Sequence, residues 1–209
     1  MSLTKEQKEI LIGIILGDGY LQKTGKKNAR LRLEHSEKQK EYLFWKYQKL
    51  KNLMQSEPKR LTRFNPIFKK KYFYYRCQSH SSPVFGKFHR WFYENQKKKI
   101  PDNIGRLLRS PLTLAVWYMD DGYYYTRDKV AYLYLPPYSL EDLQKLLESL
   151  EGDFQLKPKI YYKKNKLLPC FYFPPAETIK LFKIIKKFIH PSLKYKVAQD
   201  PVTTEGAHA

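Results

Sequence analysis

Two apolar stretches of the sequence each end in an aspartate followed by a glycine, and the two aspartates could together hold metal ions. Residues 11–19 read LIGIILGDG and residues 114–122 read LAVWYMDDG, so Asp18 and Asp121 end equivalent runs of helical composition. If the two helices pack side by side, the carboxylates meet beside two negative helix ends and repel each other. Divalent cations remove that repulsion and can activate water and stabilise a leaving oxygen in phosphodiester cleavage.

An Asp-Gly pair after a helix has a simpler interpretation, a turn in which glycine adopts the left-handed conformation. A single copy would favour that interpretation. Two copies in register, in a chain with 40 Lys+Arg and only 20 Asp+Glu, favour a site. Gly13 and Gly17 lie four residues apart on one helical face, which allows a second helix to approach closely.

The charge of the chain indicates a polyanionic partner. Its 209 residues carry a formal net charge of +20. Nucleic acid fits this excess, because phosphates neutralised by basic residues release condensed counterions. An anionic membrane is an alternative, but the sequence contains no basic amphipathic helix with a clean apolar face and no lipidation motif. A thermophile's lysine-rich surface would bring matching glutamates, which the composition lacks.

Cysteine usage and the N-terminal residues bear on the compartment. Cys77 and Cys170 form no CxxC pair, which argues against zinc and for buried free thiols. The opening MSLTKEQKEI is no signal peptide, and no stretch has the length of a membrane span. We expect an intracellular protein that is not secreted, in the cytoplasm or nucleoid of a prokaryote or encoded within an organelle.

The sequence is duplicated at an offset of about one hundred residues. Each half continues from its Asp-Gly helix through an alternating stretch, an amphipathic helix, an aromatic-rich strand region and a closing helix. The alternating stretches are 29–34 and 131–136, the strand regions 72–78, 157–163 and 167–173, and the closing helices 83–95 and 175–189. The predicted fold class is α+β, with two pseudo-symmetric αββαββ(α) halves, each with a curved antiparallel sheet, packed through the Asp-Gly helices.

Local signals divide these halves and start their middle helices. We expect an N-terminal half at 1–99, a connector at 100–110, a C-terminal half at 111–200 and a tail at 201–209. Ser36 with Gln39, and Ser139 with Asp142, have the spacing of capping boxes.

The two signature stretches identify a family. LIGIILGDG and LAVWYMDDG resemble the paired signature helices of the LAGLIDADG homing endonucleases. WYMDDG, an upstream KKKIP and a closing HPSLKYK resemble the single-chain, two-motif branch that includes intron-encoded mitochondrial enzymes of yeast. The resemblance covers about residues 8 to 197.

This resemblance implies a monomer that straddles double-stranded DNA and cuts both strands, leaving short 3′ overhangs. The final acids of the signature helices, Asp18 and Asp121, would bind Mg²⁺; Mn²⁺ would substitute, and Ca²⁺ would bind without supporting efficient cleavage. The preceding residues, Gly17 and Asp120, would lend main-chain carbonyls to the metal. Lys98 in KKKIP and Lys196 in HPSLKYK match the basic residues that assist catalysis, although Lys97 and Lys99 adjoin the first. Asp120 occupies a position of the signature that usually holds a small residue, so the sequence differs from the family pattern there.

The alternating strands suggest a DNA-reading face. If Leu31, Leu33, Phe73, Tyr75 and Cys77 point inward, polar side chains of the same strands point outward. The predicted DNA-binding residues are Arg30, Arg32, Glu34, Tyr72, Tyr74, Arg76 and Gln78 in the first half, and Tyr132, Tyr134, Lys157, Lys159, Tyr161 and Lys163 in the second. Arg can bind guanine, Gln adenine, and Glu cytosine. Because the two faces differ in sequence, we expect a long, largely non-palindromic site.

Two alternatives use the same fold. One is an RNA maturase that assists splicing of its host intron RNA. The other is a DNA-binding regulator built on a decayed endonuclease, in which one or both signature acids are usually lost. Both acids are retained here, so a sequence-specific, metal-dependent DNA endonuclease is the leading prediction.

Overall fold

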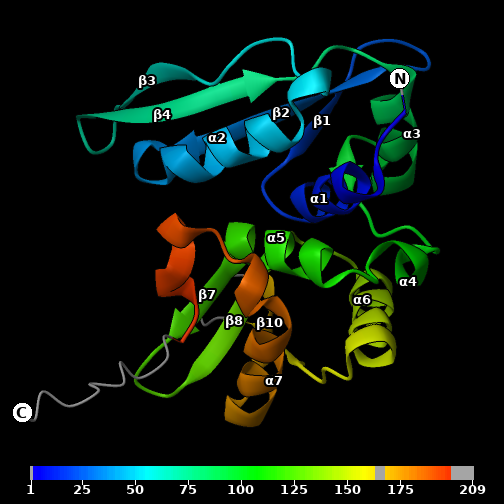
Figure 1. Cartoon of the computed structure of the whole chain (residues 1–209), viewed down its shortest axis with the longest axis vertical. Coiled ribbons are helices and arrows are strands. Elements are labelled where there is room, and N and C mark those ends of the chain that lie inside the picture. Colours follow the sequence, from blue (N-terminus) through cyan, green and yellow to red (C-terminus); the bar gives the residue numbers. More distant parts are fainter. Residues whose placement is uncertain (1, 163–167, 199–209) are drawn as a thin grey trace, which may run out of the picture.

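The computed structural model describes residues 2–162 and 168–198, so the predicted tail and Lys163 lie outside the described residues. Two similar halves lie one above the other, and the helices α1 (Lys5–Leu16) and α5 (Pro111–Asp121) pack against each other between them (Figure 1). This is the predicted α+β architecture of two αββαββ halves. No helix in the described part of the chain has the length and apolar character needed to cross a membrane.

Each half contains a four-stranded antiparallel sheet with helices on one side. In the N-terminal half the sheet order is β1-β2-β4-β3, and in the C-terminal half it is β7-β8-β10-β9. The N-terminal elements are β1 (Tyr20–Lys23), β2 (Ala29–Ser36), α2 (Lys40–Lys49), β3 (Lys59–Asn65), β4 (Lys70–Gln78) and α3 (Pro83–Phe92). The C-terminal elements are β7 (Gly122–Tyr125), β8 (Val130–Tyr134), α6 (Leu140–Phe154), β9 (Lys159–Tyr162), β10 (Pro169–Phe173) and α7 (Pro175–Ile185).

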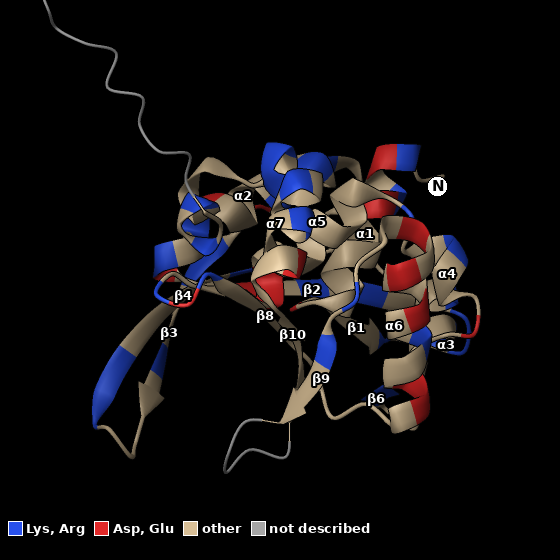
Figure 2. Cartoon of the chain, turned by 90° about the horizontal axis from the view of Figure 1, so that it is seen from below, with Lys and Arg blue, Asp and Glu red and all other residues tan. Residues whose placement is uncertain are grey.

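Short elements join and close the halves. The hairpin of β5 (Tyr93–Glu94) and β6 (Lys97–Lys98) and the helix α4 (Ile104–Leu107) connect α3 to α5. The 3₁₀ helix η4 (Pro191–Lys196) is the last helix in the described part of the chain. In Figure 2 the helices α1, α2, α5 and α7 form the upper layer, α6 runs down the right-hand side, and the β3–β4 hairpin and β9 point away from the upper layer. Each sheet therefore keeps one face clear of the helices.

The contact between α1 and α5 is very close because glycine lies at its centre. A Cβ atom at Gly13 would be 2.6 Å from the carbonyl oxygen of Thr113 and 2.7 Å from the Cβ of Val116, and one at Gly17 would be 2.6 Å from the Cβ of Asp120. Contacts advance in the same direction along both helices, so the helices run parallel and their C-terminal ends meet. Residues of both helices are buried on nearly all sides, as expected of helices at the centre of a core.

Two local predictions are wrong and have physical explanations. Ser36 precedes the 3₁₀ helix η1 (Glu37–Gln39), which leads into α2 at Lys40, but its side chain makes no capping hydrogen bond, and the side chain of Gln39 bonds to His35 instead. Phe73 lies on the side of β4 that faces the helices, but it is 39% exposed because the hairpin extends past the core. Ser139, by contrast, caps α6 by accepting a hydrogen bond from the backbone N–H of Asp142.

The close helix contact predicts opposite effects for two glycine-to-alanine substitutions. Gly13→Ala places a methyl group against backbone and should destabilise the fold by about 1–3 kcal/mol. Gly152→Ala, in the α6 helix with no atom within 4 Å of the new Cβ, should instead stabilise. That gain should be about 0.5–1 kcal/mol, from helix propensity alone. Urea unfolding measures both, and a stabilising Gly13→Ala would contradict the packing described.

Candidate functional site

The two signature acids lie at the adjoining ends of α1 and α5, but the helix ends differ. At Gly17 the backbone leaves the helical conformation, with φ −90° and ψ −133°, so Asp18 follows the helix, whereas Asp121 is the last residue of α5. None of the described glycines has a positive φ. The glycines are instead required by close approach, since a Cβ at Gly19 would lie 2.7 Å from the carbonyl oxygen of Ile14. The simple left-handed turn is therefore not what these Asp-Gly pairs form.

The acids themselves are exposed to different extents. The Asp18 side chain is 44% exposed. Burial, reinforced by the neighbouring Asp18 and Asp120, raises the pKa of Asp121 to about 8. No side chain or backbone N–H among the described residues donates a hydrogen bond to the Asp121 carboxylate. The Asp121 carboxyl group thus receives no direct hydrogen bond from the part of the chain that the structure describes.

Two lysines reach the main chain at the helix ends. Lys98 Nζ donates to the carbonyl oxygen of Gly17 over 2.5 Å, and Lys196 Nζ donates to those of Met119 (2.6 Å) and Asp120 (3.0 Å). Burial lowers the pKa of both lysines, while the nearby carboxylates act in the opposite direction. The structure therefore brings Asp18, Asp121, Lys98 and Lys196 together.

The neighbours of Lys98 in KKKIP lie elsewhere. Lys97 is exposed, and the ammonium of Lys99 pairs with Glu94 over 3.0 Å. Of these three lysines, Lys98 is the one that contacts a helix end.

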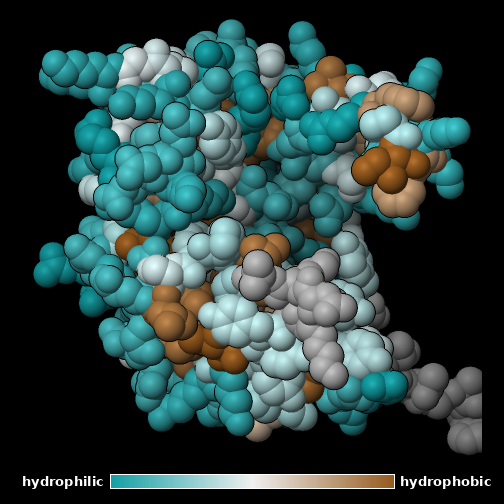
Figure 3. Space-filling view, turned by 180° about the vertical axis from the view of Figure 1, so that it is seen from behind, coloured by the Kyte–Doolittle hydropathy of each residue, from teal (hydrophilic) through white to brown (hydrophobic). Residues whose placement is uncertain are grey.

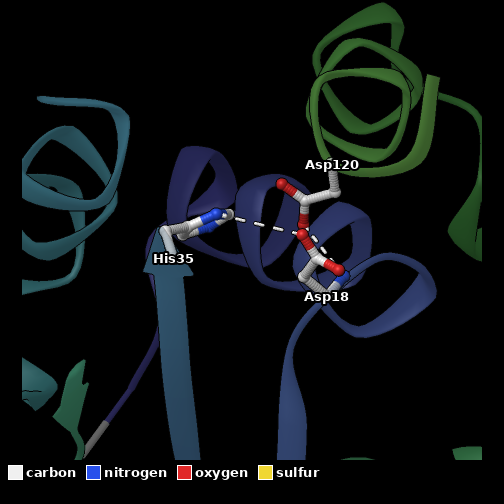
Figure 4. A group of neighbouring side chains, drawn as sticks. All are labelled: Asp18, His35 and Asp120. Carbon is white, nitrogen blue, oxygen red and sulfur yellow. Dashed lines mark hydrogen bonds and ion pairs between the residues drawn. The ribbon is translucent and has the colours of Figure 1, made fainter. Parts of the chain in front are cut away.

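A second group of residues adjoins Asp18; the sequence prediction included its member Asp120 but missed His35 and Lys46. Potential ligand atoms of Asp18, His35 and Asp120 all lie within 4.8 Å of one another (Figure 4). Lys46 Nζ already contacts two of these residues, at 2.6 Å from Asp120 Oδ1 and 2.9 Å from His35 Nε2. An ammonium group only donates, so Nε2 accepts and the ring proton is on Nδ1. Lys46 therefore supplies the cation that this trio would otherwise bind.

His35 is held as a neutral ring. Burial, followed by the charge of Lys46, lowers the pKa of His35 to about 3. Its Nδ1 lies 3.1 Å from Gln39 Oε1 and 3.9 Å from Asp18 Oδ2. The ring therefore donates its N–H to Gln39 Oε1, with the Asp18 carboxylate nearby but beyond hydrogen-bonding distance.

The free face of the N-terminal sheet is polar and mostly basic. β2 alternates strictly, with Leu31 and Leu33 buried beneath Arg30, Arg32 and Glu34. Strand register places Arg32 opposite Gln78, Glu34 opposite Arg76, and Ser36 opposite Tyr74. The seven residues predicted from the first half thus lie on one face, together with Tyr20, Gln22, Lys59 and Arg63, which the prediction omitted. The alternation of KRLTRFN at 59–65 was the signal for the last two.

Several of these side chains already have partners on the face. Glu34 accepts hydrogen bonds from Arg63 (3.0 Å) and Arg76 (2.6 Å), so its carboxylate organises two guanidinium groups. One Arg32 nitrogen donates to Gln22 over 3.1 Å. The Nε atoms of Arg30 and Arg32 are buried and have no hydrogen-bond partner in the described part of the chain.

The free face of the C-terminal sheet is rich in tyrosine. Tyr132 lies opposite Tyr123 and Tyr172, and Tyr161 lies opposite Cys170. Tyr134 and Lys159 belong to the same face, which includes a hollow. The hollow is lined by Tyr123, Tyr125, Asp128, Tyr132, Tyr134, Tyr161 and Cys170. Lys157 is placed differently from the prediction: it precedes β9, and its ammonium pairs with Glu151 of α6 at 2.7 Å.

The β3–β4 hairpin extends the N-terminal face beyond the body of the protein. Its tip exposes Phe64, Ile67 and Phe68, which form part of the brown area at the upper right of Figure 3. Arg and Lys residues occupy the hairpin strands (Figure 2).

Comparisons with known proteins agree with this geometry. The model of the LAGLIDADG DNA endonuclease family matches residues 8–181. The probable intron-encoded endonuclease 1 of Wickerhamomyces canadensis is 30% identical over 201 residues, covering 94% of this chain and 85% of the relative. Cytochrome b mRNA maturase bI2 of Debaryomyces hansenii is 30% identical over 200 residues, covering 93% of this chain and 74% of the relative.

A solved structure is also similar over nearly the whole chain. It is that of the homing endonuclease I-WcaI bound to its DNA recognition sequence. It matches with a TM-score of 0.87 and 29% sequence identity, covering 96% of this chain and 89% of that one. With both Asp-Gly motifs inside the matched residues and the helix ends adjoining in space, the chain belongs to the LAGLIDADG DNA endonuclease family.

Proposed function

We propose that this protein is a homing endonuclease that cuts both strands of double-stranded DNA at a long, largely non-palindromic site. The observation that carries the proposal is the meeting of two aspartates at the ends of closely packed helices. Protein stability alone would not select that arrangement, because like charges beside negative helix ends repel. Burial and the same repulsion by Asp18 and Asp120 raise the pKa of Asp121 to about 8, although Lys98 and Lys196 act in the opposite direction.

The donor set fits Mg²⁺. The proposed ligands are the carboxylates of Asp18 and Asp121 and the main-chain carbonyls of Gly17 and Asp120, all oxygens of the kind that hard cations prefer. Mn²⁺ should substitute, and Ca²⁺ should bind without efficient cleavage. When bound, the metal would supply an activated water and stabilise the charge that develops on the phosphate.

The two lysines act beside these acids. Lys98 and Lys196 hold the carbonyl oxygens of Gly17 and Asp120, which keeps both helix ends in place and offsets their negative charge. Burial lowers the pKa of each ammonium, which eases loss of a proton from Nζ to a neighbouring water or leaving group. Each lysine would thus steady charge or transfer a proton at its own half of the site.

The two sheet faces would read the DNA. Arginines of the first face can make bidentate contacts to guanine. Tyrosines of the second face have no guanidinium group and would contact base edges or phosphates through one hydroxyl each. Since one chain carries both acids and two different faces, it should act as a monomer on an asymmetric site.

A maturase activity on host intron RNA is the second candidate. It is supported by the 30% identity to the maturase of Debaryomyces hansenii over 93% of this chain. Retention of both acids speaks against a regulator that only binds DNA.

Removing either acid tests the proposed chemistry. Asp18→Asn and Asp121→Asn should each lower cleavage of target DNA with Mg²⁺ by about 10³-fold or more, since a metal supplies several kcal/mol of transition-state stabilisation. DNA affinity should change little. The measurement is single-turnover cleavage beside a binding isotherm, and full activity of Asp121→Asn would contradict the assignment.

Metal binding can be tested without cleavage. Ca²⁺ should raise the urea midpoint of the free protein, with a gain of about 2.7 kcal/mol when its concentration is 100 times the Kd. Asp121→Asn should lose most of that gain. The substitution removes one ligand of the ion, and it also removes the repulsion between carboxylates that the bound ion would relieve. An equal Ca²⁺ effect on both proteins would place the ion elsewhere.

Because the N-terminal sheet face is rich in arginine and the C-terminal face in tyrosine, substitutions on the two faces should cause different DNA-binding defects. Arg32→Ala should relax specificity at one or two base pairs of one half-site, where a good bidentate contact contributes about 1–3 kcal/mol. Lys159→Ala should weaken binding evenly across sequences, as a phosphate contact does. Selection of cleaved sequences from a randomised target compares them, and an unchanged base preference for Arg32→Ala would refute the assigned face.

A further inference from the structure

The two halves of the site differ at a pair of equivalent positions. Asp121 lies 103 residues after Asp18, and the same offset relates Asp120 to Gly17 and Ser149 to Lys46. Lys46 of α2 and Ser149 of α6 are both buried on the core sides of their helices. One half-site thus contains a buried Lys46–Asp120 pair, and the other contains Ser149 and Gly17 at the corresponding places.

Asp120 occupies the space that Gly17 leaves open. A Cβ at Gly17 would lie 2.6 Å from Asp120 Oδ2, so the carboxylate crosses from α5 to the end of α1. There Asp120 Oδ2 accepts a hydrogen bond of 3.1 Å from the backbone N–H of Asp18. The carboxylate therefore contacts the main chain of a catalytic acid that belongs to the other half.

This hydrogen bond replaces one that the end of α1 has lost. In a continued α-helix the N–H of Asp18 would donate to the carbonyl oxygen of Ile14. Here Gly19 donates to that oxygen over 2.8 Å, and the Asp18 N–H would be unpaired without Asp120. Asp121 is still inside α5 and needs no such acceptor.

Lys46 compensates the buried negative charge of Asp120 and holds its carboxylate in one orientation. Both side chains are fully buried, with Nζ 2.6 Å from Asp120 Oδ1. Nζ also lies 2.9 Å from His35 Nε2 and 4.5 Å from the centre of the Tyr42 ring. Because Oδ1 is engaged by Lys46, Oδ2 is left to face the Asp18 N–H.

We propose that Lys46, Asp120 and His35 form a positioning network for Asp18, confined to one half of the site. The network fixes the main chain at residue 18 through Asp120, and Lys46 also holds the His35 ring, whose Nδ1 lies 3.9 Å from Asp18 Oδ2. The side chains of all three are positioning groups; the one proposed contribution of Asp120 to the metal is its main-chain carbonyl. The inference rests on the proposed endonuclease function for its effect on cleavage, but its structural content is independent of that function.

A purely structural role is the competing explanation. Replacing a buried ion pair by apolar side chains of similar size is often neutral or stabilising, whereas removing one partner is strongly destabilising. A single substitution of Lys46 or Asp120 could therefore lower cleavage by unfolding the protein, and this loss could not be distinguished from the loss of a positioning role. Two charge-neutral double variants separate them.

The first double variant, Lys46→Met with Asp120→Asn, keeps an oxygen that can accept from the Asp18 N–H. The second, Lys46→Met with Asp120→Leu, has the same formal charge and the same branched arrangement of four side-chain heavy atoms but no acceptor. Both should fold and bind target DNA like the wild type. Both variants keep the main-chain carbonyl of residue 120, so they are compared with each other: the leucine variant should cleave about 10–100-fold more slowly than the asparagine variant, the usual range for groups that orient a metal ligand.

Two readouts do not depend on cleavage. Amide hydrogen exchange in a peptide containing Asp18 should be faster in the leucine variant than in the asparagine variant. Mn²⁺ binding, followed by electron paramagnetic resonance, should be weaker by about 10-fold in the leucine variant only. Equal exchange and equal Mn²⁺ affinity in the two variants would overturn the network. If instead the wild type cut no DNA while exchange and Mn²⁺ binding still differed, the proposed function would fail and the network would stand.

Discussion

The close parallel contact between α1 and α5 is the constraint on which the site depends. Gly13 and Gly17 let the helices approach until backbone meets side chain, and this brings both helix C-termini to one place. Carboxylates at that place repel each other and the helix dipoles, so the surroundings must supply positive charge. Lys98, Lys196 and Lys46 reach the site from three different elements and do so.

Much of this arrangement could be predicted from the sequence because it is duplicated. Comparing the chain with itself identifies Asp18 and Asp121 and gives the αββαββ plan, which the structure confirms. Strand alternation also predicts correctly which side chains of β2 leave the core, since the period of two is strict there. The family resemblance pointed to Lys98, and the structure places that lysine on the Gly17 carbonyl.

The Lys46 network could not be found in the same way, because the duplication hides differences between the halves. Lys46 is one of 40 basic residues, and a helical lysine ordinarily has a solvated head group. Its position between Leu43 and Tyr47 on the apolar stripe of α2, together with an acid at the usually small position 120, was the available signal. The predicted capping box at Ser36 was wrong for a related reason. It required the side chain of Gln39, which instead forms a hydrogen bond with His35. In both cases the contact partner decides: Asp120 lies 74 residues from Lys46, whereas His35 lies only four residues from Gln39 but outside the cap pattern.

The central claim is that two acids at paired helix ends cut the two strands of one DNA site. Its most direct test is to incubate the wild-type protein and Mg²⁺ with a randomised duplex library and to sequence the cut ends of both strands. The account predicts a single asymmetric consensus in which the two cut positions are separated by one fixed, short stagger with 3′ overhangs. Cuts without a shared sequence, or a stagger that varies from molecule to molecule, would contradict it.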